Sequence, residues 1–294
     1  MSATSILKSL LLVVGFLNVV FPATVNAAPT DKPPFYKVTY HGKTAYLLGS
    51  IHIGKPDFYP LPEQIELAFE RSQALVVEAD VRGVDVQALL QQYGAKPLPI
   101  DETTQVVLAN YCQDKARLCE ALSHYAPWLQ SMQLSVGRYS ALGYSAEYGI
   151  DSVLVSRAEH RAVYELESTE FQFELLSSFS PKTQWEMVRE AIEAPDDDML
   201  SLISAWRRGD NVELALLIEG EMLQQDNTEM VKKMLWDRNR DMAAKMIELL
   251  STASTEQSLF VVVGAGHLVG SQSVQSYLSS QEVELQNCWV VNCK

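Results

Sequence analysis

The amino-acid sequence predicts an α/β fold, with a central mixed sheet built from strand and helix units at both ends of the chain and a largely helical middle layer. Three observations lead to this prediction. Short apolar runs that end in polar residues lie near both ends of the chain. Two of these runs, ending at Leu48 and Val263, pass into the same Gly-x-x-His motif. Strands alternate with helices around a long segment that looks mostly helical, and this alternation is typical of α/β proteins.

The expected strands are short and mostly apolar. The first two form a hairpin that turns at residues 41–43, and the third and fourth each end in an acidic residue. The expected strands are residues 36–40, 44–48, 74–78, 162–167, 259–263 and 283–291. The first helix begins next to Pro60 and Pro62, and proline is common at a helix entry. The expected helical segments are residues 62–71, 86–139, 145–159, 170–250 and 271–280.

The first 27 residues are expected to be a signal peptide rather than part of the fold. Lys8 supplies a positive charge, residues 10–21 are mostly apolar, and Val25-Asn26-Ala27 has the small-x-small pattern of a cleavage site. A retained membrane anchor is the alternative, although the apolar run is short for a membrane-spanning helix. We expect cleavage near Ala27 and a periplasmic or secreted mature protein without a stable membrane span. Residues 28–294 are expected to form a single domain with a helical insertion around residues 86–139.

Charge and cysteine content agree with export. The formal net charge is −14, so nucleic acid is not an expected partner. The four cysteines lie in two local pairs, and we predict the disulfides Cys112–Cys119 and Cys288–Cys293, which suit an oxidising compartment. In one unbroken helix the Cα atoms of the first pair would be about 10 Å apart, so this disulfide requires a helix break around residues 113–115. A thiolate metal site is the alternative, but neither pair has CxxC spacing.

Four polar residues are the candidates for a functional site. His52, Glu78, Glu167 and His267 each lie at or just beyond the end of an expected core strand. If these strands are parallel, the four side chains gather at one edge of the sheet, where open α/β sheets bind ligands. Two imidazoles and two carboxylates suit a divalent Mn, Fe, Co or Zn ion. Such an ion makes a bound water nucleophilic, and a second carboxylate is then available as general base.

Each of these residues also has a purely structural interpretation. The glycines of the two motifs can serve tight turns, and each histidine can be a hydrogen-bonded residue at the rim of the sheet. Glu78 can cap a helix or form a salt bridge. Glu165 and Glu170 are acids close to Glu167 in sequence and equally available. The remaining histidines are expected in surface or capping roles; they are His41, His124 and His160.

Several motifs, taken together and in order, resemble the TraB/GumN family over nearly the whole mature chain. These motifs are residues 46–54, 58–62, 74–80, 148–151, 165–168, 206–210, 238–239 and 263–268. The superfamily is similar to the Tiki membrane-associated metalloproteases and, more remotely, to erythromycin esterases and haem-binding ChaN-like proteins. The resemblance implies a metal-dependent hydrolase scaffold with His52, Glu78 and His267 in the site and Arg238 nearby. This chain departs from the pattern at Ser168, where the family more often has threonine, and the resemblance does not explain the Cys112–Cys119 segment.

The residues and the resemblance together lead to one main hypothesis, an exported, peptidase-like, metal-dependent hydrolase acting on a peptide or small-molecule substrate. His52, Glu78, Glu167 and His267 are the expected metal ligands, and Glu78 is the expected base or bridging ligand. Arg238 is expected to stabilise the developing oxyanion, although a solvated charge on the helix is its structural alternative. The alternative function is a non-catalytic protein that binds and sequesters a peptide or haem-like ligand in the same crevice.

Overall fold

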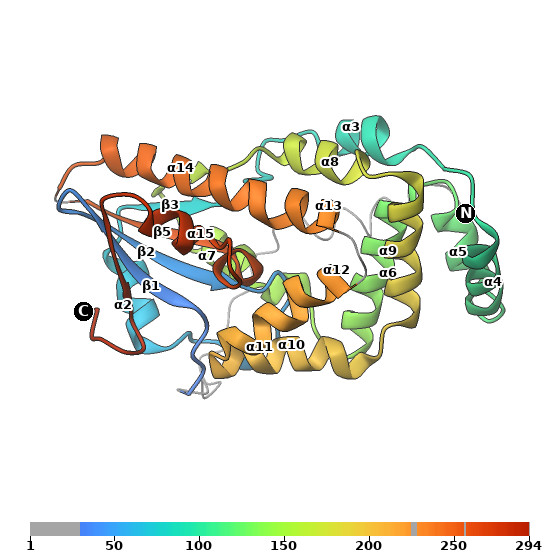
Figure 1. Cartoon of the computed structure of the whole chain (residues 1–294), viewed down its shortest axis with the longest axis horizontal. Helices are drawn as coiled ribbons and strands as arrows, with labels where there is room; N and C mark the ends of the chain where they lie inside the picture. The colour runs from blue at the N-terminus through green and yellow to red at the C-terminus, as the bar shows by residue number, and fades with distance from the viewer. Residues whose placement is uncertain (1–29, 225–227, 256, 294) are drawn as a thin grey trace. The chain divides into compact units, whose positions relative to one another are not determined.

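The computed structural model describes residues 30–224, 228–255 and 257–293, and the expected signal peptide lies outside the described residues (Figure 1). The described chain divides into two compact units. The helical unit comprises residues 81–146 and 169–196, and the sheet unit comprises residues 30–80, 147–168 and 197–293. The expectation of a single domain with an insertion around residues 86–139 stays a prediction.

The described part of the sheet unit contains a six-stranded mixed sheet with the order β4-β3-β5-β2-β1-β6. Its strands are β1 (Phe35–Tyr40), β2 (Lys43–Ser50), β3 (Ala74–Val77), β4 (Ala162–Glu165), β5 (Ser258–Gly264) and β6 (Val283–Asn287). β1 and β2 form the predicted antiparallel hairpin, and β6 pairs with β1 in antiparallel fashion. β4, β3, β5 and β2 are parallel neighbours. The predicted α/β class with a mixed sheet is therefore confirmed.

Helices and helical turns of different lengths connect these strands. The α-helices of the sheet unit are α2 (Glu63–Arg71), α7 (Ile150–Ser156), α10 (Asp196–Arg208), α11 (Asn211–Ala215), α12 (Glu221–Gln224), α13 (Thr228–Val231), α14 (Asp237–Thr252) and α15 (Val274–Ser279). Three 3-10 turns are η1 (Pro56–Phe58), η3 (Ala146–Tyr148) and η6 (Ala265–Leu268). Two π-helical turns are η4 (Leu216–Gly220) and η5 (Lys232–Trp236).

The core of the sheet unit follows from the alternation of side chains along the strands. Val261 and Val263 of β5 pack in one cluster with Met242 of α14. Phe260, one residue before Val261, points to the opposite face, where its ring lies 5.3 Å from that of Phe69 in α2. β5 has strands on both sides and helices on both faces, so its central residues are fully buried. This burial explains why the sequence of β5 is almost entirely apolar.

Four predicted elements differ from the structure. The helix predicted at residues 145–159 is the 3-10 turn η3 followed by the shorter helix α7. The sequence predicts a core strand at residues 162–167, but β4 is an edge strand with mostly exposed side chains, because only β3 pairs with it. The final strand ends at Asn287 rather than at residue 291, since the chain then turns and Cys288 pairs with Cys293. The last helix begins at Val274 rather than at residue 271, because Ser273 is its N-cap.

The long, mostly helical segment predicted at residues 86–139 consists of several shorter helices, which belong to the helical unit. They are α3 (Val86–Leu89), the π-helical turn η2 (Leu90–Gly94), α4 (Glu102–Tyr111), α5 (Ala116–Leu122) and α6 (Pro127–Ala141), followed by α8 (Thr169–Ser177) and α9 (Pro181–Glu193). The chain turns at residues 112–115, and this turn brings the Cα atoms of Cys112 and Cys119 to 5.9 Å, with their sulfur atoms 1.98 Å apart. The predicted helix break is confirmed. Together with Cys288–Cys293, whose Cα atoms are 5.3 Å apart, this pair fits an exported protein.

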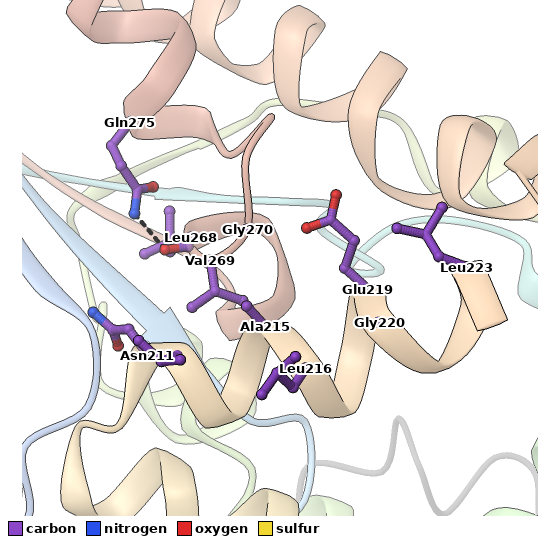
Figure 2. A pocket seen from close by; sticks show the side chains of 11 residues that line it. Asn211, Ala215, Leu216, Glu219, Gly220, Leu223, Leu268, Val269, Gly270 and Gln275 are labelled. Carbon is purple, nitrogen blue, oxygen red and sulfur yellow. Dashed lines mark hydrogen bonds between the residues drawn. The ribbon is translucent and has the colours of Figure 1, made fainter.

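Two further findings concern surfaces. A cavity of about 510 Å³ lies in the sheet unit between α11, η4 and the segment that follows η6 (Figure 2).

Among the described residues, no helix combines the length and the apolar character needed to cross a membrane.

Candidate functional site

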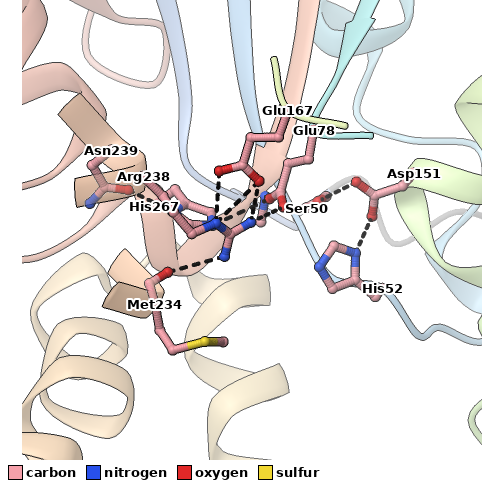
Figure 3. Close-up of polar contacts among 10 residues, drawn as sticks. Ser50, His52, Glu78, Asp151, Glu167, Met234, Arg238, Asn239 and His267 are labelled. Atoms are coloured by element: carbon pink, nitrogen blue, oxygen red, sulfur yellow. Dashed lines mark hydrogen bonds and ion pairs between the residues drawn. The ribbon is translucent and has the colours of Figure 1, made fainter. Parts of the chain in front are cut away.

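The four predicted site residues all lie at one edge of the sheet (Figure 3). Glu78 follows β3 directly, and His52 and Glu167 lie two residues after β2 and β4. His267 lies in η6, the turn that follows β5. Because these four strands are parallel neighbours, their carboxyl ends meet at the same edge. The structure therefore brings the four residues together in the sheet unit.

A buried ion-pair network joins the two carboxylates. Arg238 of α14 donates from Nε to Glu167 Oε1 at 2.8 Å, and from Nη2 to Glu167 Oε2 at 2.8 Å and Glu78 Oε2 at 2.9 Å. Its Nη1 donates to the Met234 carbonyl at 3.1 Å. A guanidinium has five N–H groups, so four are used within the protein. Arg238 is 8% exposed, and the interpretation as a solvated helix charge is wrong.

The second oxygen of Glu78 faces His267. Glu78 Oε1 accepts the backbone N–H of Gly264 at 2.5 Å and lies 3.5 Å from His267 Nε2. Burial alone would raise the pKa of Glu78, but its interactions with His267, His52 and Arg238 and the Gly264 N–H lower that pKa to about 2. Glu78 is therefore ionised at neutral pH.

The ring of His267 is fixed by an amide. Its Nδ1 lies 2.5 Å from Asn239 Oδ1, and Asn239 Nδ2 donates to the Gln272 carbonyl at 2.7 Å. The second bond turns the amide oxygen toward the ring, so Nδ1 carries the proton and donates it. Burial lowers the pKa of His267 to about 4, so the ring is neutral near pH 7 and its Nε2 lone pair faces Glu78.

A carboxylate holds the ring of His52. Asp151, in α7, lies with Oδ2 2.9 Å from His52 Nδ1, and its Oδ1 accepts the Ser50 hydroxyl at 2.9 Å. The Asp151 charge raises the pKa of His52 to about 9. The side chain of His52 is 66% exposed, whereas that of His267 is 6% exposed. One imidazole is thus open to solvent and the other is buried.

The missing side chain of Gly264 leaves an open space among these groups. A Cβ atom added at Gly264 would lie 3.1 Å from Glu78 Oε1, 3.5 Å from His52 Nε2 and 3.7 Å from His267 Cδ2. Within the described ranges, no three His, Cys, Asp or Glu side chains already have the spacing of a complete metal cage. The donors around the space nevertheless fit a divalent ion, because imidazole and carboxylate are its usual ligands. Each imidazole also has Nδ1 held by a side-chain oxygen, as in most metal-binding histidines.

Sequence reasoning assigned no role to Asp151 and Asn239. Both lie in motifs that carry the family resemblance, and that was the only signal available for them. Glu165 does not take the place of Glu167, because its carboxylate accepts the Asp80 backbone N–H at 2.5 Å. Glu170 belongs to the helical unit, where it accepts the Tyr93 hydroxyl.

Comparison with known proteins identifies the family of this chain and two of its relatives. The sequence pattern of the TraB/PrgY/gumN family matches residues 34–287. Two curated relatives, the uncharacterized protein YbaP of Shigella flexneri and that of Escherichia coli (strain K12), are each 33% identical over 153 residues. The matched segment is 51% of this chain and 58% of each relative, so the chain spans little more than half the length of these relatives. No solved structure shows a significant match.

Proposed function

Because the chain belongs to the TraB/PrgY/gumN family and gathers two imidazoles and a buried carboxylate at one sheet edge, we propose that it is an exported metal-dependent hydrolase that cleaves an amide or ester bond. One observation carries the proposal. His267 Nε2 lies 3.5 Å from Glu78 Oε1, and His52 Nε2 borders the same space beside Gly264. The lone pairs of His267 Nε2 and Glu78 Oε1 repel each other at this distance, and a cation shared between them removes the repulsion. His52, whose pKa of about 9 keeps it protonated at neutral pH, would release its Nε2 proton on binding the ion.

The donor atoms of the proposed site are Nε2 of His52, Nε2 of His267 and Oε1 of Glu78. They would hold a Mn, Co, Fe or Zn ion. When bound, such an ion lowers the pKa of a coordinated water and polarises a substrate carbonyl. Glu167 is also a predicted ligand, but both of its oxygens accept hydrogen bonds from Arg238. We propose that Glu167 orients Arg238 instead.

The protein's own residues fix the donors in place. Asp151 and Asn239 each hold one imidazole by Nδ1, which leaves Nε2 for the site. Arg238 holds Glu78, and together with His267, His52 and the Gly264 N–H it lowers the pKa of Glu78. The low pKa of Glu78 favours the role of ligand over that of base, since a general base works best with a pKa near the working pH. Stabilisation of an oxyanion by Arg238 stays a prediction.

The first experiment measures metal binding by calorimetry and metal analysis on the full mature chain, with Mn²⁺, Co²⁺ and Zn²⁺. We expect Gly264→Ala to lose roughly tenfold or more in affinity, because its methyl group fills the space between the donors. The backbone φ of Gly264 is −52°, which alanine adopts without strain, so this variant is expected to fold. His267→Ala should lose affinity as well, and the exposed His160→Ala is the matched control that should not.

The second experiment measures hydrolysis of peptide and ester panels with and without a chelator. Hydrolysis that stops on chelation and returns with metal supports the proposal. Metal affinity that is unchanged in both Gly264→Ala and His267→Ala, or hydrolysis insensitive to chelation, would contradict it. A wild-type protein that binds peptide but cleaves none of the panel supports the alternative, a non-catalytic binder.

A further inference from the structure

A second candidate site lies in the sheet unit, in the cavity shown in Figure 2. We call it the Glu219 cavity. Its walls come from α11, from the π-helical turn η4 and from the segment Leu268–Gly270, with Gln275 at one side. Leu268 directly follows His267, so one wall of the cavity continues from the candidate metal site. The volume of about 510 Å³ is sufficient for an amino-acid side chain and its backbone.

Two buried amide oxygens in this cavity have no hydrogen-bond partner. They are Asn211 Oδ1 and Gln275 Oε1, and no other described residue has such a side-chain atom. Asn211 Nδ2 donates to the Tyr36 hydroxyl at 3.0 Å, and Gln275 Nε2 donates to the Leu268 carbonyl. These bonds leave the two oxygens as the unpaired atoms. A buried acceptor without a partner is unfavourable, and a ligand that carries N–H groups would satisfy both.

The same cavity contains a buried carboxylate without a counter-ion. Glu219 is 9% exposed, and its Oε1 accepts the indole N–H of Trp236 at 2.6 Å. Across the described ranges, no Lys, Arg or His side chain forms an ion pair with it. Gly270, with φ +83°, permits the close approach, since a Cβ atom there would lie 1.9 Å from Glu219 Oε2. A carboxylate removed from water in this way favours a cationic partner.

From this chemistry we propose that the Glu219 cavity binds the lysine or arginine side chain of a polypeptide substrate, where the term substrate rests on the proposed hydrolase function. The charged group of the ligand pairs with Glu219. The backbone N–H groups of the ligand donate hydrogen bonds to the amide oxygens of Asn211 and Gln275. Leu216 and Leu223 supply apolar surface for the methylene stem. The net charge of −14 attracts such a ligand from a distance.

The test compares two capped tripeptides, acetyl-Ala-Lys-Ala-amide and the same peptide with norleucine in place of lysine, by calorimetry on the full mature chain. We expect the lysine peptide to bind the wild type roughly tenfold or more tightly. Glu219→Gln should abolish the preference while its amide oxygen still accepts the Trp236 N–H. Asn211→Asp adds a second carboxylate to the cavity, and the Tyr36 hydroxyl can donate a hydrogen bond to it. The added negative charge should increase the preference for the lysine peptide over the norleucine peptide. Glu213→Gln removes a charge from α11 outside the cavity lining and is the matched control.

Two results would overturn the inference. One is equal binding of the two peptides by the wild type, and the other is a preference unchanged in both Glu219→Gln and Asn211→Asp. Asn211→Asp decides the question if Glu219→Gln does not fold. The same titration on His267→Ala separates the two proposals: a retained lysine preference supports the cavity whether or not the metal site is correct. Metal-dependent hydrolysis that is indifferent to lysine would contradict the cavity inference alone.

Discussion

Arg238 and Arg240 are two residues apart on α14, yet they have opposite environments. Arg238 is enclosed by two buried carboxylates, whereas the side chain of Arg240 is 57% exposed and pairs with Asp237 and Asp241. A buried charge without its partner is costly, whereas an exposed ion pair contributes little. The two positions therefore form an internal comparison.

We predict that Arg238→Met lowers the free energy of unfolding by about 3–5 kcal/mol, because it leaves Glu78 and Glu167 buried without a counter-ion. Arg240→Met should change it by less than about 0.5 kcal/mol. Urea unfolding of both variants measures the difference. Adding Glu167→Gln to Arg238→Met should restore part of the loss, since one of the unpaired charges is removed. Equal stability of the two single variants would refute the structural role of Arg238.

The sequence locates the site residues better than it locates their partners. The common position of the four candidates at one edge of the sheet was predictable because a parallel strand places the residue at its carboxyl end at that edge. These candidates are His52, Glu78, Glu167 and His267. Asp151 and Asn239 lie in helices, and which side chain a helix turns toward the sheet depends on tertiary packing. Arg238 stands among charged residues in sequence, and only the folded structure shows that it is buried.

At the scale of secondary-structure elements, the turn between α4 and α5 shows how a covalent bond and a helix break depend on each other. Cys112 and Cys119 are seven residues apart, and they meet because α4 ends at Tyr111 and α5 begins at Ala116. This break was predicted from the geometry of a disulfide alone. The edge position of β4 was not predicted, because strand order depends on pairing between distant segments.

We predict that the unreduced, denatured protein has no free thiols, as measured by labelling with a thiol reagent. Replacing both Cys112 and Cys119 with serine should lower the free energy of unfolding by about 2 kcal/mol, because the unfolded chain then gains the freedom of the short loop. Thermal unfolding of the double variant, with and without reductant, checks this. Reductant should destabilise the wild type more than the variant. Labelled thiols in the unreduced wild type would show that the pairs are not bonded.

At the scale of the whole molecule, the alternation of strands and helices was enough to predict the α/β class, but not the order of the strands. β5 comes last among the four parallel strands along the chain, yet it lies between β3 and β2 in the sheet. Apolar runs at residues 74–78 and 259–263 look alike in sequence. Their order in the sheet is set by long-range pairing, which local patterns do not encode.

We predict that a chain truncated after residue 257 forms no cooperative structure in the sheet unit, because β3 and β2 are not hydrogen-bonded to each other without β5. A chain truncated after residue 282 loses the edge strand β6, the Cys288–Cys293 disulfide and Trp289, whose indole N–H donates to the Pro33 carbonyl. Because it keeps β5, it should keep a cooperative, less stable transition. Circular dichroism and limited proteolysis during thermal unfolding compare the two. A cooperative transition in the sheet unit of the shorter chain would contradict the prediction.

The position of β5 also has a consequence for the timing of folding. While the chain is being made, the strands that flank β5 present unpaired edges and cannot join until residues 258–264 emerge from the ribosome. A late central strand delays completion of the sheet until most of the polypeptide has been synthesised. If the protein is exported as an extended chain, as we propose, we expect this delay to keep the polypeptide competent for translocation, so that the sheet closes in the destination compartment.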